Sequence, residues 1–206
     1  MICMDKENPD RKHSDRRIPE IPPIGQIREE LARVEAKYGF WKTLWNVTAV
    51  LLVAAAVTAL LATRLFVLIR INGNSMEPGM SDRDIIVIHQ TKKIQPGEAI
   101  GFYYGGRILI KRVIGSAGDQ INIDKDGNVS VNGELLKEPY VAEKNQGKCE
   151  LEFPFEVPEG TVFVLGDNRA VSIDSRIRSI GCVEREQIVG KAVFRAWPPD
   201  RMGMMR

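Results

Sequence analysis

The chain has 206 residues, of which 44% are hydrophobic and 27% are charged, and its formal net charge is only +2. This length suits one domain of ordinary size with an appendage. A charge so small and so evenly spread argues against a nucleic-acid-binding surface. The cysteines, Cys3, Cys149 and Cys182, form no metal-binding spacing and no dense disulfide framework. Cys149 and Cys182 can pair only in an oxidising compartment, so we treat them as free or structural.

The N-terminal region changes character near residue 23. Residues 1–23 are polar and end in the proline-rich stretch "IPEIPP", a composition typical of a disordered tail. In the next segment, apolar residues recur three or four positions apart: Ile24, Ile27, Leu31, Val34 and Tyr38. This period predicts a short amphipathic helix that lies on a membrane, pairs with another helix or is simply solvated.

Residues 43–63 carry no charge and predict a membrane-spanning helix. As a helix they would rise about 30 Å, which matches the apolar core of a bilayer. A cleavable signal peptide is the alternative, but its apolar region is only about 7 to 15 residues long, so we favour a retained anchor. Aromatic and basic residues flank the start of the span: Phe40, Trp41, Trp45, Arg28, Arg33, Lys37 and Lys42. Basic residues on this side predict a cytoplasmic N-terminus.

The rest of the chain, residues 64–206, predicts one all-β extracytoplasmic domain. Short runs of Ile, Val and Phe alternate with Gly, Pro, Asn and Asp, the pattern of strands and turns. These runs occupy residues 64–71, 84–90, 99–104, 107–115, 120–133, 160–168 and 188–197. The clearest is "INIDKDGNVSVNG", whose alternation around Asp126 and Gly127 predicts a hairpin. The predicted organisation is therefore a tail with a short helix (1–42), an anchor (43–63) and a β domain (64–206).

Ser75 lies just beyond the predicted span in "NGNSMEPGM" and would need a base to act as a nucleophile. His89 is the only histidine of the β domain. A triad through it is a weak possibility, and a surface position on a strand is the ordinary interpretation. One histidine without a close carboxylate cluster predicts no metal site, and nothing in the sequence indicates a cofactor.

Lys111 is the second candidate base. The strand period in "RILIKRVIG" puts it on the same face as Leu109 and Val113, where apolar surroundings would favour the uncharged amine. Lowering its pKa from about 10.4 to about 8 requires roughly 3 kcal/mol, which is within the range known for buried lysines. The alternative is a lysine whose stem packs while its ammonium reaches water.

Three segments behind the apolar span resemble the motifs of bacterial type I signal peptidases. They are "SMEPGM" (75–80), "KRVIGSAGD" (111–119) and "GDNRAVSIDSR" (166–176), in this order. The single anchor and modest length resemble the compact form common in Gram-positive bacteria. The resemblance implies the all-β signal-peptidase fold that LexA-type autopeptidases share. It also implies removal of signal peptides from secretory pre-proteins after a small-x-small sequence.

The resemblance also implies roles for single residues. Ser75 matches the nucleophile and Lys111 the general base. Ser172 matches a serine that hydrogen-bonds the lysine amine, and Asp174 and Arg176 match residues that hold its loop in place. Many members carry a serine of the oxyanion hole two positions before the nucleophile, where this chain has Gly73. The backbone N–H of Ser75 is then the main candidate to stabilise the oxyanion.

The family binds its substrate as an added strand between two segments, which correspond here to residues 70–74 and 107–110. The candidate walls of the small-residue pocket are Ile71, Met76, Ile110 and Ile173; plain core is the alternative for each. We therefore expect secretory pre-proteins and membrane lipids as partners, and no nucleic acid. The expected location is the cell membrane, crossed once, with the catalytic domain on the extracytoplasmic face.

Other classes of protein remain open at this point. A self-cleaving regulator could use the same Ser75 and Lys111, but the N-terminal region has no helix-turn-helix pattern and the anchor ties the domain to a membrane. In a membrane-tethered β-module without catalysis, Ser75 would be a turn residue. A sortase-like enzyme that uses Cys149 or Cys182 with His89 is the remotest alternative.

Overall fold

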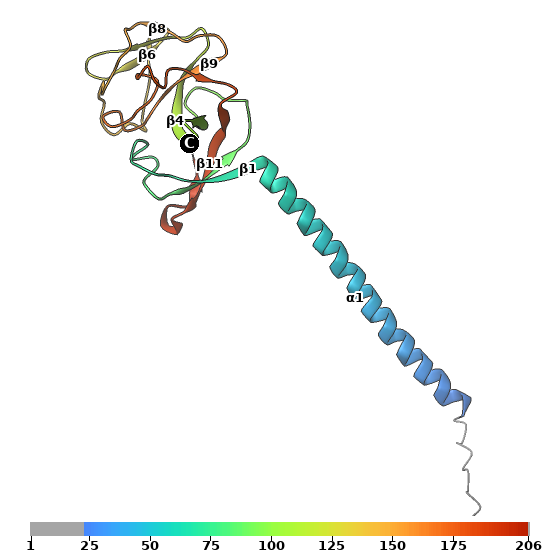
Figure 1. Cartoon of the computed structure of the whole chain (residues 1–206). Coiled ribbons are helices and arrows are strands. Elements are labelled where there is room, and N and C mark those ends of the chain that lie inside the picture. The colour runs from blue at the N-terminus through green and yellow to red at the C-terminus, as the bar shows by residue number, and fades with distance from the viewer. Residues whose placement is uncertain (1–22, 206) are drawn as a thin grey trace, which may run out of the picture. The chain divides into compact units, whose positions relative to one another are not determined.

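The computed structural model describes residues 23–205, so residues 1–22 of the predicted tail lie outside the described part. It begins with one long helix, α1, Ile24–Leu65 (Figure 1). The predicted amphipathic segment and the predicted span, residues 24–42 and 43–63, therefore form one unbroken helix of 42 residues, about 63 Å long. No proline interrupts α1, and the single glycine at the junction, Gly39, is too weak a breaker to end it.

Within the described residues, α1 is the one helix that is long and apolar enough to cross a membrane. None of its side chains is buried within the chain. A helix that is apolar on all sides needs an apolar environment, and along residues 43–63 a bilayer would provide one.

The β domain that follows contains strands and one short 3-10 helix. They are β1 Phe66–Arg70, β2 Ile85–His89, β3 Ala99–Tyr104, β4 Arg107–Ser116, β5 Gln120–Ile123, β6 Val129–Val131, β7 Glu134–Leu135, β8 Phe155–Glu156, β9 Thr161–Leu165, β10 Val183–Glu184, β11 Ile188–Trp197, η1 Pro199–Arg201 and β12 Gly203–Met204. Every run of apolar residues singled out in the sequence contains a strand, which confirms the all-β prediction. The strands that the sequence did not predict, β7, β8, β10 and β12, have two residues each and are too short to display a period.

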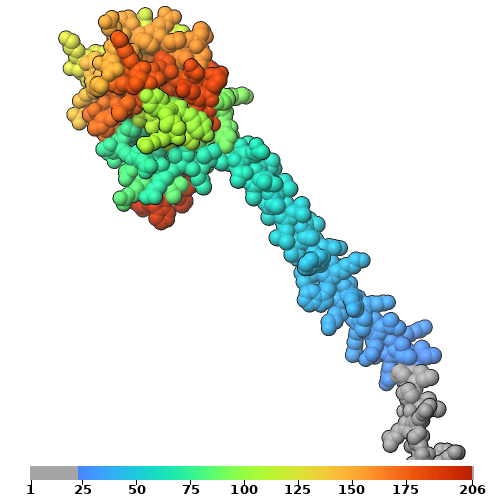
Figure 2. All heavy atoms as spheres, in the orientation of Figure 1, coloured from blue at the N-terminus to red at the C-terminus, as the bar shows by residue number. Residues whose placement is uncertain are grey.

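The strands form two antiparallel sheets. The larger has the order β1-β2-β11-β3-β4-β9-β10, with β12 paired to β11, and the smaller has the order β7-β6-β5-β8. The smaller sheet lies at the end of the β domain opposite β1 (Figures 1 and 2). One cluster of buried core residues contains side chains from both segments that flank Ser75 in the structure: Ile71, Met76, Met80, Ile86, Ile88, Ala99 and Ile110.

The predicted hairpin is present between β5 and β6, where Ile121 pairs with Val131 and Ile123 pairs with Val129. The connecting residues, 124–128, are fixed by the carboxylate of Asp124, which accepts hydrogen bonds from the backbone N–H groups of residues 126 and 128. Gly127 has a φ of +80°, which glycine adopts without strain.

Within residues 23–205, β1 and the first half of β4 each have an edge without a neighbouring strand, and both edges lie near Ser75. β1 pairs only with β2, and β9 joins β4 only from Arg112 onward, which leaves residues 107–111 paired with β3 alone. Unpaired backbone groups on such edges can accept an additional strand.

Candidate active site

Ser75 lies in the loop that connects β1 to β2, and hydrogen bonds hold this loop at its base. Gly73 has a φ of +101° and donates its N–H to Asp82 Oδ1 at 2.9 Å. Met76 and Met80 are fully buried in the core cluster. Ser75 thus lies between Gly73, whose N–H is hydrogen-bonded, and Met76, whose side chain is buried. The burial of Met76 explains why an apolar residue directly follows the serine.

Lys111 reaches this hydroxyl from β4. Its Nζ donates a hydrogen bond to Ser75 Oγ at 2.6 Å, and the side chain is only 4% exposed. Burial lowers the pKa of the Lys111 amine from 10.5 to about 8, although the carboxylates of Asp174 and Asp167 oppose part of this shift. A substantial fraction of the amine is therefore neutral close to physiological pH.

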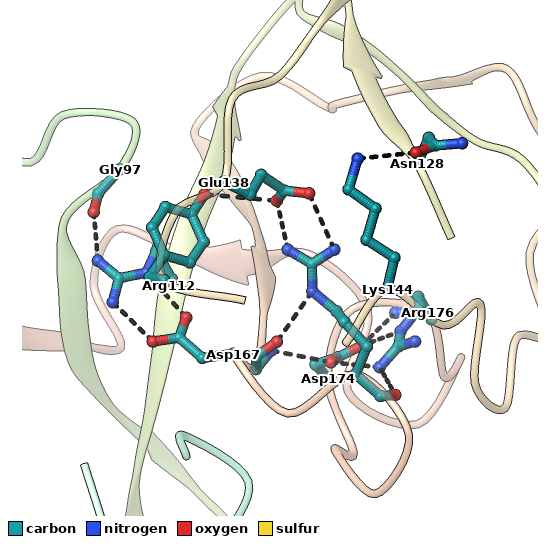
Figure 3. Close-up of polar contacts among 11 residues, drawn as sticks. Gly97, Arg112, Asn128, Glu138, Lys144, Asp167, Asp174 and Arg176 are labelled. Carbon is teal, nitrogen blue, oxygen red and sulfur yellow. Dashed lines mark hydrogen bonds and ion pairs between the residues drawn. The ribbon is translucent and has the colours of Figure 1, made fainter. Parts of the chain in front are cut away.

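The buried ion pair of Arg112 with Asp167 connects β4, which carries Lys111, to the 166–176 loop, which is hydrogen-bonded to Ser75 (Figure 3). Arg112 binds Asp167 through two hydrogen bonds, of 2.8 and 2.7 Å, and donates a third to Gly97 O at 2.7 Å. The next residue, Asn168, donates its N–H to Ser75 O at 3.1 Å. Burial alone would lower the pKa of the Arg112 guanidinium, but its hydrogen bonds and ion pair with Asp167 outweigh burial and raise it. The positions of base and nucleophile are therefore coupled through this pair.

Asp174 and Arg176 also form a buried ion pair, through hydrogen bonds of 2.8 Å from Nε and 2.8 Å from Nη2. Asp174 Oδ2 accepts the N–H of Gly166 at 3.0 Å, and Arg176 donates to the carbonyl of Arg169 at 2.9 Å. Both charged side chains are at most 1% exposed. The pair ties the end of the 166–176 loop to its beginning.

A third buried pair, Arg169 with Glu138, was not predicted (Figure 3). Arg169 Nε donates to Gly166 O at 3.0 Å, and its guanidinium binds the Glu138 carboxylate. Nearby, the ring of Tyr140 lies 4.0 Å from the guanidinium carbon of Arg112. Burial and the Glu138 carboxylate both raise the pKa of Tyr140. Sequence reasoning missed Glu138 because it lies far from its partner in the chain and outside any strand.

Ser172 differs from its prediction. Its Oγ is buried and has no hydrogen-bond partner among the described residues, so it does not bind the Lys111 amine in this structure. The backbone is fixed, since the N–H of Ser172 binds Asn168 O at 3.1 Å, whereas the hydroxyl is oriented only by rotation about its side-chain bond. A Cβ added to Gly166 would lie 2.5 Å from both Ser172 Cβ and Ser75 O. Ser172 therefore lies close to the nucleophile's backbone.

The cleft beside Ser75 lies between the free edges of β1 and β4. A depression of about 370 Å³ is lined by residues 69–72 and 107–111 together with Ser75 and Met76. Ile71, Met76 and Ile110 line this depression and also belong to the core cluster. In Figure 2 the teal residues of β1 and the loop after it adjoin the yellow-green residues around β4 on one face of the domain.

Ile173 lies elsewhere, which corrects its predicted place in this pocket. It is 62% exposed and lines a second depression, of about 550 Å³, that also contains Ser75 and Lys111. The alternation of the 166–176 loop explains the difference, because the buried Ser172 and Asp174 on either side turn the side chain of Ile173 outward.

The alternative catalytic residues do not assemble. His89 contacts the ring of Phe66, with ring centroids 5.4 Å apart, and lines neither depression that contains Ser75. Cys149 and Cys182 are both free. Burial raises the pKa of the Cys182 thiol, which opposes formation of a thiolate.

A hydroxyl hydrogen-bonded to a buried amine of lowered pKa is the arrangement that acyl transfer by a serine with a lysine base requires. Chemically, the site is therefore suited to a serine hydrolase.

Comparison with known proteins identifies the family. The model of the family described as "Signal peptidase, peptidase S26" matches residues 44–197. Signal peptidase I of Bacillus caldolyticus is 35% identical over 162 residues, which are 71% of this chain and 87% of that protein. Signal peptidase I of Bacillus amyloliquefaciens is 31% identical over 160 residues, 72% of this chain and 85% of that protein. The chain therefore belongs to the signal peptidase family, peptidase S26.

Two further matches extend the comparison. A probable signal peptidase I-2 of Synechocystis is 34% identical over 148 residues, which are 66% of this chain and 65% of that protein. A crystal structure of a signal peptidase I from Enterococcus faecalis is 32% identical, with a TM-score of 0.42, and the match covers 48% of this chain and 96% of that one.

Proposed function

We propose that this protein is a membrane-bound serine endopeptidase that removes signal peptides from secretory pre-proteins after a small-x-small sequence. The observation that carries the proposal is the 2.6 Å hydrogen bond between Ser75 Oγ and the buried Lys111 Nζ, whose pKa is about 8. Membership of the signal peptidase family supports the substrate class.

In the proposed reaction, neutral Lys111 accepts the proton of Ser75 while Oγ attacks the scissile carbonyl carbon. The resulting oxyanion is stabilised by the N–H of Ser75, which no hydrogen bond engages within residues 23–205. The N–H of Gly73 is already bound to Asp82 and does not contribute. When the C–N bond breaks, the Lys111 ammonium gives its proton to the leaving amine. Water then attacks the acyl-enzyme ester while Lys111 accepts its proton, and Lys111 returns this proton to Ser75 Oγ as the bond between Oγ and the acyl carbon breaks.

The substrate would enter as an extended strand between the free edges of β1 and β4. Support comes from the depression between these edges, which is lined by residues from both. Side chains of a strand alternate, so the first and third residues before the scissile bond face the same side of the cleft. The walls there include Ile71 and Ile110, which are packed in the core and cannot retract, and this favours small substrate residues.

The same proposal gives α1 the role of a single-pass anchor across residues 43–63, with the N-terminus in the cytoplasm and the β domain outside. The length and apolar composition of the helix support the anchor, and the basic residues before the span support its orientation. An anchored enzyme meets its substrate in the same thin layer, because a signal peptide is itself apolar.

The energetics of Lys111 argue against a β-module without catalysis. Holding an amine at a pKa of about 8 instead of 10.5 costs the ammonium about 3 kcal/mol. A purely structural position gives no reason to retain that cost, since an apolar residue of similar size would avoid it.

The test uses the full chain in detergent with a pre-protein that carries an Ala-x-Ala site, followed by N-terminal sequencing of the product. We expect one cut after the second alanine by the wild-type protein and none by Ser75→Ala. An uncut pre-protein, or equal cleavage by Ser75→Ala, would contradict the proposal.

A further inference from the structure

The second depression beside Ser75 is not explained by the reaction as described so far. It has a volume of about 550 Å³, contains both Ser75 and Lys111, and is lined by Tyr104, Leu109, Val171, Ile173 and Ile180. It differs from the first depression in its walls, since no residue of β1 lines it and the 166–176 loop does.

Val171 and Ile173 are unusual within this loop. Val171 is 53% exposed and Ile173 is 62% exposed, whereas Ser172, between them, is buried. The loop is held by the Asp174–Arg176 pair and by the hydrogen bond from Ser172 N to Asn168 O. The two side chains are therefore apolar, β-branched and presented from a fixed backbone beside the reactive pair. Exposed apolar groups of this kind commonly mark a binding surface.

The chemistry of the leaving group indicates which part of the substrate occupies the second depression. An endopeptidase binds its substrate on both sides of the scissile bond, and the segment before the bond would fill the depression between β1 and β4. The leaving amine must receive its proton from Lys111 Nζ, so the first residues after the bond must lie in the remaining space beside this amine. The second depression adjoins both Ser75 and Lys111 and is that space.

We propose that Val171 and Ile173 bind the first two residues of the mature protein and favour an apolar side chain there. The inference rests on the proposed function and adds to it a selectivity for the segment after the bond. Tyr104 would form another side of this subsite, with its hydroxyl bound to Ser179 O at 3.1 Å.

Photo-crosslinking tests the placement without any turnover. The full-length Ser75→Ala protein in detergent is mixed with a pre-protein that carries one benzoylphenylalanine at the second position after the bond. We expect labelling within residues 171–180. A probe five positions before the bond is the control and should label other parts of the chain. Labelling by the first probe only outside 171–180 would overturn the assignment, and no labelling by either probe would count against the proposed function as well.

Cleavage kinetics test the selectivity. Two pre-proteins differ only in leucine or glutamine at the first position after the bond, because these side chains are similar in size and differ in polarity. We expect the wild-type kcat/KM to favour leucine by roughly 5- to 10-fold, the order of a modest apolar contact. Val171→Ala with Ile173→Ala should bring the ratio close to one.

Two controls separate this selectivity from general damage. Leu135→Ala removes an apolar side chain that is 66% exposed on β7, outside both depressions, and should leave the ratio unchanged. Preference for alanine over leucine immediately before the bond should persist in the double variant. An unaltered leucine-to-glutamine ratio in that variant would refute this inference and leave the proposed function standing, whereas a wild-type protein that cleaves neither pre-protein would contradict the proposed function itself.

Discussion

Besides the direct hydrogen bond between Lys111 and Ser75, the ion pair of Arg112 with Asp167 links the backbones that carry these two residues. The arginine follows Lys111 in β4, the aspartate precedes Asn168, and the N–H of Asn168 holds Ser75 O at 3.1 Å. A shift of residues 167–168 away from β4 would therefore have to break a buried ion pair whose side chains are 4% and 0% exposed. Precise placement of base and nucleophile matters because proton transfer between them depends on hydrogen-bond geometry.

Asp167→Asn should damage both stability and cleavage. Asn at position 167 removes the negative charge that the buried Arg112 guanidinium binds, and removing one partner of a buried pair costs about 3–5 kcal/mol. Urea unfolding and the pre-protein assay measure the two effects. Lys148→Gln is the matched control, because its pair with Glu150 is solvent-exposed and screened and should contribute little to stability. Equal effects of the two substitutions would contradict a special role for the buried pair.

Activity should rise with pH through about 8, because the neutral form of Lys111 accepts the serine proton and burial lowers its pKa to that value. Lys111→Arg should be inactive, since a guanidinium does not deprotonate. His89→Ala, which alters a side chain away from the cleft, is the control and should keep the wild-type profile. An active Arg variant would remove Lys111 from the mechanism.

The same lysine should destabilise the fold. Its folded pKa of about 8 lies below its ordinary 10.5, so between these pH values the unfolded chain binds more protons and stability rises with pH. Lys111→Met should therefore be more stable than wild type by up to about 3 kcal/mol at pH 7, with a difference that shrinks as the pH approaches 10.5. Urea unfolding of both proteins across this range gives the comparison, and a difference independent of pH would refute the burial argument.

Gly166→Ala should impair both fold and activity, because the added Cβ would lie 2.5 Å from Ser75 O and from Ser172 Cβ. Overpacking of this kind costs about 1–3 kcal/mol and would displace the backbone of the nucleophile. Gly203→Ala is the control, since a Cβ there meets no atom within 4 Å. Melting temperature and cleavage rate compare the two variants. A fully active Gly166→Ala would show that the 166–176 loop can move to accommodate the added Cβ, and it would contradict the prediction.

A chain that begins at residue 65, without the apolar span, should still bind anionic vesicles and cleave better in their presence. Phe66 is 44% exposed, Leu68 68% and Trp197 52%, so core burial does not account for these apolar side chains, whereas Phe194 is half-buried. Vesicle co-sedimentation and the pre-protein assay with and without lipid would test this. A domain that stays in the supernatant and is indifferent to lipid would refute membrane contact and leave Ser75 and Lys111 unaffected.

Much of the fold could be read from the sequence, because strand-forming runs of Ile and Val, turn residues and an uncharged apolar span are local patterns. The hairpin around Gly127 and the strand that carries Lys111 were predictable for this reason. The pairing of Ser75 with Lys111 came from resemblance, since residues 36 positions apart carry no local sign of contact.

Tertiary structure alone decided the rest. Only the packed domain shows that the Lys111 amine is buried, that Glu138 neutralises Arg169, and that the Ser172 hydroxyl has no hydrogen-bond partner within residues 23–205. It also shows that Ile173 lines the second depression and not the predicted pocket, because the direction of a loop side chain depends on how its neighbours are buried. Burial, the resulting pKa and the choice of charge partner all depend on contacts between segments distant in sequence, and those contacts exist only once the sheets have formed.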